Sequence, residues 1–150
     1  MRNLPIRDNY YDTVLNISTL EHIGFDNTMF IRSDEYAEHK PDSFLAALSE
    51  LRRVLRPGGR LLITVPYGKY IDAGTFQLFD AALVKRLISA FEPSHFDLCY
   101  FRYTSRGWNY ATAEECSNAE YVPWVMNPMH QRPADFPVQP DGAMATRAVA

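Results

Sequence analysis

Two side chains that can move protons stand side by side near the start of the chain. Glu21 and His22 follow a short apolar run directly. A histidine titrates near neutral pH, and burial or neighbouring groups can bring a carboxylate into the same range, so both residues are candidate catalytic groups. Ser18-x-x-Glu21 is also the pattern of a helix capping box, a purely structural device. A glutamate bonded to its own helix end would be less free to act as a base. His22 is either a general base or a packed or capping residue.

The element expected to position this pair is a strand over Tyr10–Ile17. Its unbroken run of Val14, Leu15 and Ile17 is typical of a strand buried on both faces in a parallel sheet. The capping pattern then predicts a short helix from Ser18 to about Ile23, which Gly24 ends. Ligands bind at such strand-to-helix junctions in open α/β sheets, so we expect the functional site just beyond Ser18.

Residues 24–40 have no sustained periodicity and are expected to form a long loop beside the site. The loop either contributes to a pocket or forms a surface excursion with its own small apolar cluster. The residues concerned are Phe25, Met29, Phe30, Ile31 and Tyr36.

A strand–helix–strand unit follows from the next segment. Apolar residues recur at the helical period from Phe44 to Leu55, and Pro41 suits a first helical position. Pro57-Gly58-Gly59 is expected to end this helix, and the apolar run Arg60–Val65 predicts a second strand, parallel to the first.

The rest of the chain alternates in the same way. The sequence predicts a loop over Tyr67–Thr75, a helix from about Asp80 to Phe91 and a strand over Phe96–Tyr103. A second capping box, Thr112-x-x-Glu115, predicts a short helix towards Tyr121. We therefore expect one domain, with an α/β core in residues 1–122, a Pro-rich loop in residues 123–142 and the start of a last strand in residues 143–150.

Several other side chains have two interpretations. Tyr67, Lys69 and Tyr70 either contact a substrate or are plain surface, and we favour the surface. Trp108, Tyr110 and Trp124 either cover a pocket or complete the core. The arginines Arg52, Arg53 and Arg56 are most simply a solvated helix end, with phosphate binding as the alternative.

Composition excludes several classes of protein. With 47% hydrophobic and 22% charged residues, the 150-residue chain is neither disordered nor a membrane protein. A net charge of −3 gives no basic surface for nucleic acid. The histidines lack metal-site spacing, so no metal is expected. No signal peptide is evident, so a cytoplasmic location with Cys99 and Cys116 reduced is expected.

Two stretches resemble the second half of the class I S-adenosylmethionine-dependent methyltransferases. They are YDTVLNISTLEHIG, which contains the Ser-x-Leu-Glu-His ending, and LSELRRVLRPGGRLLITVPYG, with its Glu-x-x-Arg-Val-Leu-x-Pro-Gly-Gly-x-Leu pattern. The resemblance implies an α/β, Rossmann-like fold with a mostly parallel sheet and flanking helices. It implies transfer of a methyl group from S-adenosyl-L-methionine to a small-molecule or sugar-linked acceptor. The backbone of Asn16, Ile17 and Ser18 would contact the cofactor, and Glu21 and His22 would lie at the mouth of the site.

The chain departs from the family pattern in one respect. The Gly-rich turn after the family's first strand and the acidic residues that hold the ribose and the adenine have no counterpart here. We therefore expect an incomplete methyltransferase domain that lacks the first strands. The alternative is a non-catalytic half-domain, or interaction module, without cofactor binding. The strand at Tyr10–Ile17 would then have an unpaired edge, which predicts self-association through that edge. An NAD-binding oxidoreductase would need the same missing Gly-rich turn.

Overall fold

The computed structural model describes residues 1–104, 107–120 and 143–149, with backbone only for Met29 and for residues 143–149. The strands are β1 (Tyr11–Ile17), β2 (Leu55–Tyr67), β3 (Ile71–Asp72), β4 (Gln77–Leu78), β5 (His95–Thr104), β6 (Gly107–Ala111) and β7 (Ala143–Val149). The α-helices are α1 (Thr28–Ile31), α2 (Phe44–Val54), α3 (Ala81–Phe91) and α4 (Ala113–Cys116). The 3-10 turns are η1 (Leu20–His22), η2 (Asp34–Tyr36) and η3 (Pro41–Ser43).

Five strands form one sheet in the order β1-β2-β7-β5-β6, and β3 pairs with β4 in a separate hairpin. β1 and β2 are parallel, as predicted. β7 lies between β2 and β5 and is antiparallel to both, so β1, β2 and β5 run in one direction. The α/β, partial Rossmann-like fold is therefore confirmed, although β7 and the β5–β6 hairpin make most of the strand pairings antiparallel.

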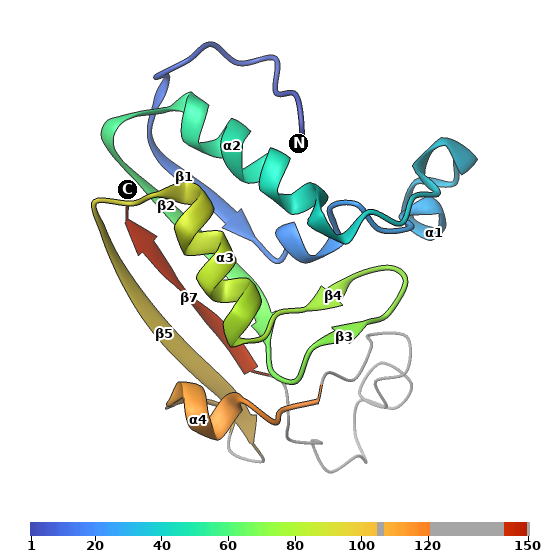
Figure 1. Ribbon diagram of the computed structural model, residues 1–150, viewed down its shortest axis with the longest axis vertical. Helices are drawn as coiled ribbons and strands as arrows, with labels where there is room; N and C mark the ends of the chain where they lie inside the picture. The colour runs from blue at the N-terminus through green and yellow to red at the C-terminus, as the bar shows by residue number, and fades with distance from the viewer. Residues whose placement is uncertain (105–106, 121–142, 150) are drawn as a thin grey trace.

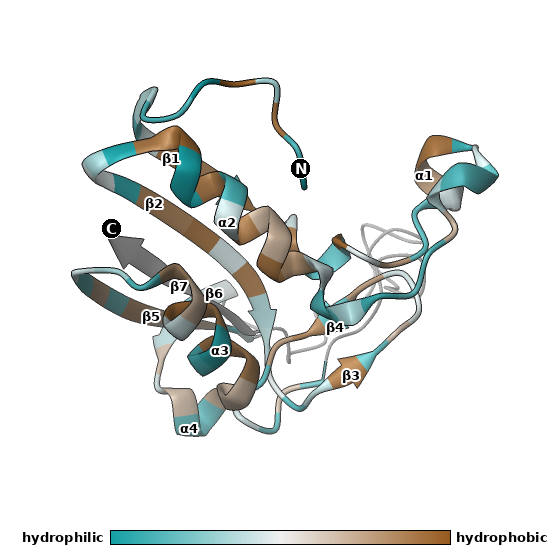
Figure 2. Cartoon of the chain, turned by 45° about the horizontal axis from the view of Figure 1, so that its top comes forward, coloured by the Kyte–Doolittle hydropathy of each residue, from teal (hydrophilic) through white to brown (hydrophobic). Residues whose placement is uncertain are grey.

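The helices α2 and α3 pack against each other over one face of the sheet (Figure 1). The hydrophobic run of β2, visible in Figure 2, alternates between the two faces. Leu61, Ile63 and Val65 are buried beneath the helices, whereas Leu62 and Thr64 on the other face are partly exposed. The described core therefore lies on one side of the sheet.

β1 does not have the two buried faces that its sequence predicted. Leu15 is 65% exposed and Ile17 is 54% exposed, while Asn16 on the opposite face is 4% exposed. The prediction was wrong because the described helices cover only one face of the sheet. β1 is also an edge strand, since β2 is its only neighbour among the described strands.

The middle helix is shorter than predicted, and the strand after it is longer. α2 ends at Val54 and β2 begins at Leu55, so Arg56 belongs to the strand. Pro57-Gly58-Gly59 does not separate helix from strand but lies in an irregular part of β2, where the pairing shifts from Tyr11 with Leu55 to Thr13 with Arg60. Gly58 has a φ of 76°, which favours glycine.

Further along the chain, α3 is capped as predicted, because the Asp80 side chain accepts from the Leu83 N–H. The box of Thr112 and Glu115 also forms, although α4 ends at Cys116 rather than near Tyr121. β6 and the β3–β4 hairpin fall in segments expected to be turn and loop. Both cysteines are free thiols.

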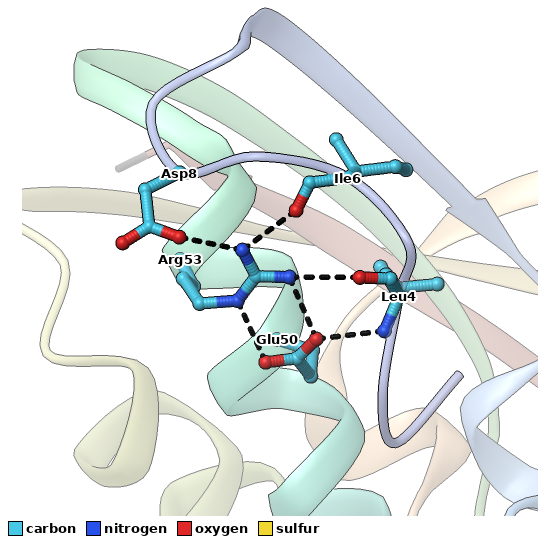
Figure 3. A network of polar contacts seen from close by, with 5 residues as sticks. All are labelled: Leu4, Ile6, Asp8, Glu50 and Arg53. Carbon is cyan, nitrogen blue, oxygen red and sulfur yellow. Dashed lines mark hydrogen bonds and ion pairs between the residues drawn. The ribbon is translucent and has the colours of Figure 1, made fainter.

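The N-terminal segment is attached to α2 by one polar network (Figure 3). The Arg53 guanidinium donates to both carboxylate oxygens of Glu50, at 2.8 Å each, and to the Leu4 and Ile6 carbonyls at 3.1 and 2.7 Å. It also pairs with Asp8 at 2.6 Å, and Glu50 accepts from the Leu4 N–H at 2.8 Å. Arg53 is therefore a structural residue, while Arg52 and Arg56 form ion pairs with Glu92 and Asp12.

This network predicts a specific acid sensitivity. The hydrogen bonds from Arg53, and then that from the Leu4 N–H, lower the pKa of Glu50 to about 2. A carboxyl with a depressed folded-state pKa stabilises the fold above its ordinary pKa and loses that contribution as the pH falls through the folded value. Urea unfolding of the wild type should therefore lose stability between about pH 4.5 and pH 2, and Glu50→Gln should flatten this loss. Glu35→Gln, at an exposed carboxylate without an ion pair among the described residues, should keep the wild-type slope. Equal slopes for wild type and Glu50→Gln would contradict this assignment.

Candidate functional site

The chain turns sharply where β1 ends. Ser18 has a φ of 43°, in the left-handed region that non-glycine residues rarely occupy. Its N–H donates to the Thr64 hydroxyl at 2.9 Å and approaches the Thr64 carbonyl at 3.1 Å. These contacts extend the β1–β2 ladder by one residue and hold the unusual conformation, which is a common property of functional turns.

The capping box predicted for Ser18 and Glu21 does not form. The residue before η1 is Thr19, whose hydroxyl donates back to the Ile17 carbonyl at 2.8 Å and does not cap the turn. Ser18 is committed to Thr64 in a left-handed conformation. The pattern therefore failed because a tertiary contact to the neighbouring strand replaced the local one.

Glu21 is buried instead. It is 4% exposed, and its Oε2 atom has no hydrogen-bond partner among the described residues. Burial raises its pKa to about 7, against a smaller opposing effect of its own backbone N–H. Glu21 is not among the residues that line the cavity described next.

A cavity of about 450 Å³ opens at the carboxyl end of β1. This volume lies within the range of small-molecule sites. The lining residues come from the N-terminus, the corner after β1 and the α1–η2 segment, and they are Met1, Arg2, Ser18, Thr19, His22, Ile23, Gly24, Asn27, Phe30, Ile31, Tyr36 and Glu38. The site therefore lies where the sequence placed it.

The segment over residues 24–40 contributes one wall of the cavity and projects beyond the sheet (Figure 1). Phe30, Ile31 and Tyr36 line the cavity as expected. Phe25 does not, because it is fully buried in the core, and the Met29 side chain lies outside the description. The segment is not a plain loop, since it contains α1 and η2.

The two ends of this segment are joined tightly. The Lys40 N–H donates to the Gly24 carbonyl at 2.6 Å. Gly24 has a φ of 91°, and a Cβ there would lie 2.1 Å from the Lys40 carbonyl oxygen. Only glycine fits this position without moving the backbone.

His22 is partly buried and lines the cavity. Its Nδ1 atom lies 2.8 Å from the Thr75 carbonyl oxygen in the turn between β3 and β4. Phe30 and Phe76 contact the imidazole, with ring centroids 6.0 and 5.8 Å away. The hairpin, which the sequence did not predict, thus fixes the ring that the sequence singled out.

Asn16 and Ile17 present different groups. The Asn16 side chain is 4% exposed; its Nδ2 lies 3.7 Å from the Met1 sulfur, and its Oδ1 has no partner in the described part of the chain. Because the backbone groups of alternate residues point to the same side of a strand, the bond from Ser18 to Thr64 places those of Asn16 towards β2. The N–H and C=O of Ile17 therefore face the open edge.

Other predicted contacts are absent from this cavity. Tyr67 is buried against Tyr100, with ring centroids 4.8 Å apart, so it is neither surface nor a cavity residue. Lys69 and Tyr70 do not line the cavity either. Trp108 and Tyr110 are 52% and 81% exposed on β6 and do not complete the core. Trp124 lies outside the described residues.

The sequence gave no signal for one pair of cavity residues. Arg2 binds both carboxylate oxygens of Glu38, at 2.7 and 3.0 Å, across 36 residues of sequence. Within the described ranges, no group of three or more His, Cys, Asp or Glu side chains could hold a metal ion. No helix of the described chain is long and apolar enough to cross a membrane.

Comparisons with known proteins agree with this geometry. The model of the methyltransferase domain family matches residues 1–63, which contain β1, the corner, α2 and the first part of β2. No curated protein matches the chain. An S-adenosylmethionine-dependent methyltransferase from Archaeoglobus fulgidus superposes with a TM-score of 0.52 at 10% identity, over 97% of this chain and 62% of its own. One from Thermotoga maritima has a TM-score of 0.50 at 15% identity, over 99% of this chain and 61% of its own.

The fold is therefore that of the class I S-adenosylmethionine-dependent methyltransferases, and the resemblance seen in the sequence is confirmed. Residues 1–63 carry the methyltransferase domain pattern. The chain spans 33% to 62% of the length of the solved structures that it resembles.

The buried carboxyl at Glu21 makes stability depend on pH in the opposite direction to Glu50. A carboxyl whose pKa is raised on folding favours the folded state most below its ordinary pKa, and this advantage disappears as the pH rises through about 7. Glu21→Gln is neutral at every pH, so it should unfold less readily than wild type at pH 8, by about 2–3 kcal/mol at 1.36 kcal/mol per pKa unit. At pH 4 the two should be nearly equal. Glu35→Gln serves as the exposed control, and a Glu21→Gln effect that is the same at pH 4 and pH 8 would refute the assignment.

Proposed function

We propose that the chain takes part in methyl transfer from S-adenosyl-L-methionine to a small-molecule acceptor. The carrying observation is the cavity of about 450 Å³ that places His22 and the Ser18 corner together at the carboxyl end of β1. Ligands of open α/β folds bind at this end of the strands. The family match of residues 1–63 supports the reaction class.

The residues at this corner fit one side of the cofactor. The Asn16 Oδ1 atom is a buried acceptor without a partner among the described residues, and such atoms commonly await a ligand or water. We propose that Asn16, Ile17 and Ser18 hold the methionine part, with Asn16 accepting from its ammonium group and Ile17 offering its outward N–H and C=O. When bound, the cofactor supplies an electrophilic methyl group on a sulfonium.

The acid–base role falls to His22. It lines the cavity, and its ring is held by Thr75, Phe30 and Phe76. The cavity therefore offers an acceptor both a position and a group that can take its proton, and positioning supplies a large share of catalysis in such transfers. Glu21 was the second candidate. We assign it to a buried site behind the corner rather than to contact with substrate, because it does not line the cavity.

Two competing possibilities make different predictions. A sugar-linked acceptor would need more polar groups than the apolar side of this cavity presents, so we favour a compact organic acceptor. A non-catalytic half-domain would bind no cofactor. Tight binding of a nicotinamide dinucleotide instead of an S-adenosyl compound would reject the proposal outright.

A pair of proline variants tests the cofactor corner. Ile17→Pro removes an N–H that faces the open edge and leaves the β1–β2 ladder intact. Isothermal titration with S-adenosylhomocysteine should show binding to the wild type and at least about tenfold weaker binding to Ile17→Pro, as expected for a lost contact and a displaced corner. Leu15→Pro also removes an outward N–H, but two residues before the corner, and should bind like wild type. Undiminished binding by Ile17→Pro, or no binding by folded wild type, would overturn the assignment.

The open edge supports a second proposal, self-association of the chain through β1. The edge carries no lysine or proline, and its one charge, Asp12, is paired with Arg56 at 2.7 Å. Leu15 and Ile17 expose apolar surface beside the unpaired backbone groups.

Light scattering coupled to size-exclusion chromatography tests this association. Wild type should elute above monomer mass, and Leu15→Lys should shift it to monomer. Tyr110→Lys, at an exposed position on the opposite edge strand β6, should have no such effect. A monomeric wild type with one cooperative thermal transition would contradict the proposal.

A further inference from the structure

The hydrogen bond to Thr75 determines which nitrogen of His22 carries its proton. The Nδ1 atom lies 2.8 Å from the Thr75 carbonyl oxygen. A carbonyl oxygen only accepts, so Nδ1 must donate. A neutral His22 therefore has its proton on Nδ1 and an unshared electron pair on Nε2.

The Nε2 atom is the group left for a ligand. No described residue bonds to it, and the interactions of His22 are those with Thr75, Phe30 and Phe76. His22 lines the cavity while Thr75 does not. The ring therefore turns Nδ1 to the hairpin and leaves its other edge available to the cavity.

The rest of the cavity selects a neutral, flat and largely apolar ligand. Its apolar side is made by Ile23, Ile31 and the rings of Phe30 and Tyr36. Its only charged side chains, Arg2 and Glu38, neutralise each other through two contacts of 2.7 and 3.0 Å. A charged ligand would find no unpaired opposite charge among the lining residues, whereas an aromatic ring can pack against these walls.

We propose that the cavity binds a phenol, whose hydroxyl donates to Nε2 of His22, and that this aromatic hydroxyl is the group that accepts the methyl; this rests on the function proposed above. Proton transfer breaks the phenol O–H bond and places the proton on Nε2. The oxygen keeps the electron pair that it needs as a nucleophile. The resulting imidazolium carries a proton on each nitrogen, and the Thr75 carbonyl stabilises the one on Nδ1.

The strength of acids decides for a phenol over an aliphatic alcohol. An imidazole has an ordinary pKa of about 6.5 and a phenol one of about 10, whereas an alkyl hydroxyl is close to water at about 15.7. The gap for a phenol is thus about 3.5 units and for an alcohol about 9. General-base catalysis by an imidazole is effective only across the smaller gap.

The first test needs no variant. Ring ¹⁵N chemical shifts of His22 in the free wild-type chain should show the Nδ1–H tautomer, and p-cresol should shift the Nε2 resonance more than that of Nδ1. An Nε2–H tautomer in the free chain would overturn the proposal.

The second test compares p-cresol with 4-methylanisole, which has the same ring and an O-methyl group in place of the hydroxyl. Wild type should bind p-cresol about 2- to 10-fold more tightly, which is the worth of one hydrogen bond. His22→Asn keeps an amide that can donate to Thr75 but has no acceptor at the position of Nε2, so the preference should vanish. His22→Gln restores an acceptor near that position and should recover part of the preference. Equal binding of the two probes by wild type would overturn the proposal.

Titration with S-adenosylhomocysteine in parallel separates the two levels of the argument. Cofactor binding without a p-cresol preference removes the phenol and leaves methyl transfer standing. A p-cresol preference without cofactor binding removes methyl transfer and leaves the phenol site.

Discussion

The hydrogen bonds between the Ser18 N–H and Thr64 are the constraint on which the site depends. They close the β1–β2 ladder at its carboxyl end and hold Ser18 in a left-handed conformation. Everything that follows, from the turn at His22 to the cavity wall of α1 and η2, leaves the sheet in the direction that this corner sets. The site is thus built on the rigid element of the fold, with its variable parts on loops.

The corner is supported on one side only. α2 and α3 cover the face of β2 that carries Leu61, Ile63 and Val65, and the polar network at Arg53 attaches the N-terminal segment to the outer side of α2. The opposite face leaves Leu15 and Ile17 open to solvent. The same strand therefore joins the site to the least protected surface of the described molecule.

The two capping patterns show how far a sequence can be trusted locally. Thr112 and Glu115 form their box because α4 presents free N–H groups and nothing else competes for the threonine. Ser18 and Glu21 have the same spacing, but the neighbouring strand binds Ser18 and the core takes Glu21. The apolar periods of α2 and α3 predicted those helices well, because burial of one helical face is a property of the segment itself. The β3–β4 hairpin and the pair of Arg2 and Glu38 depend on partners distant in sequence, and no local pattern encodes them. For the same reason, the sequence identified His22 and could not find the carbonyl that orients it.

The close junction of Gly24 with Lys40 has a consequence for how this cavity can diversify. The segment between them leaves and re-enters the domain through one narrow neck, in the manner of an Ω-loop. Insertions, deletions or exchanges within it would change the ligand-facing wall while the neck transmits little distortion to the sheet. Evolution, or an engineer, can therefore graft a new lobe for a new acceptor onto an unchanged scaffold, provided that the glycine at the neck is kept.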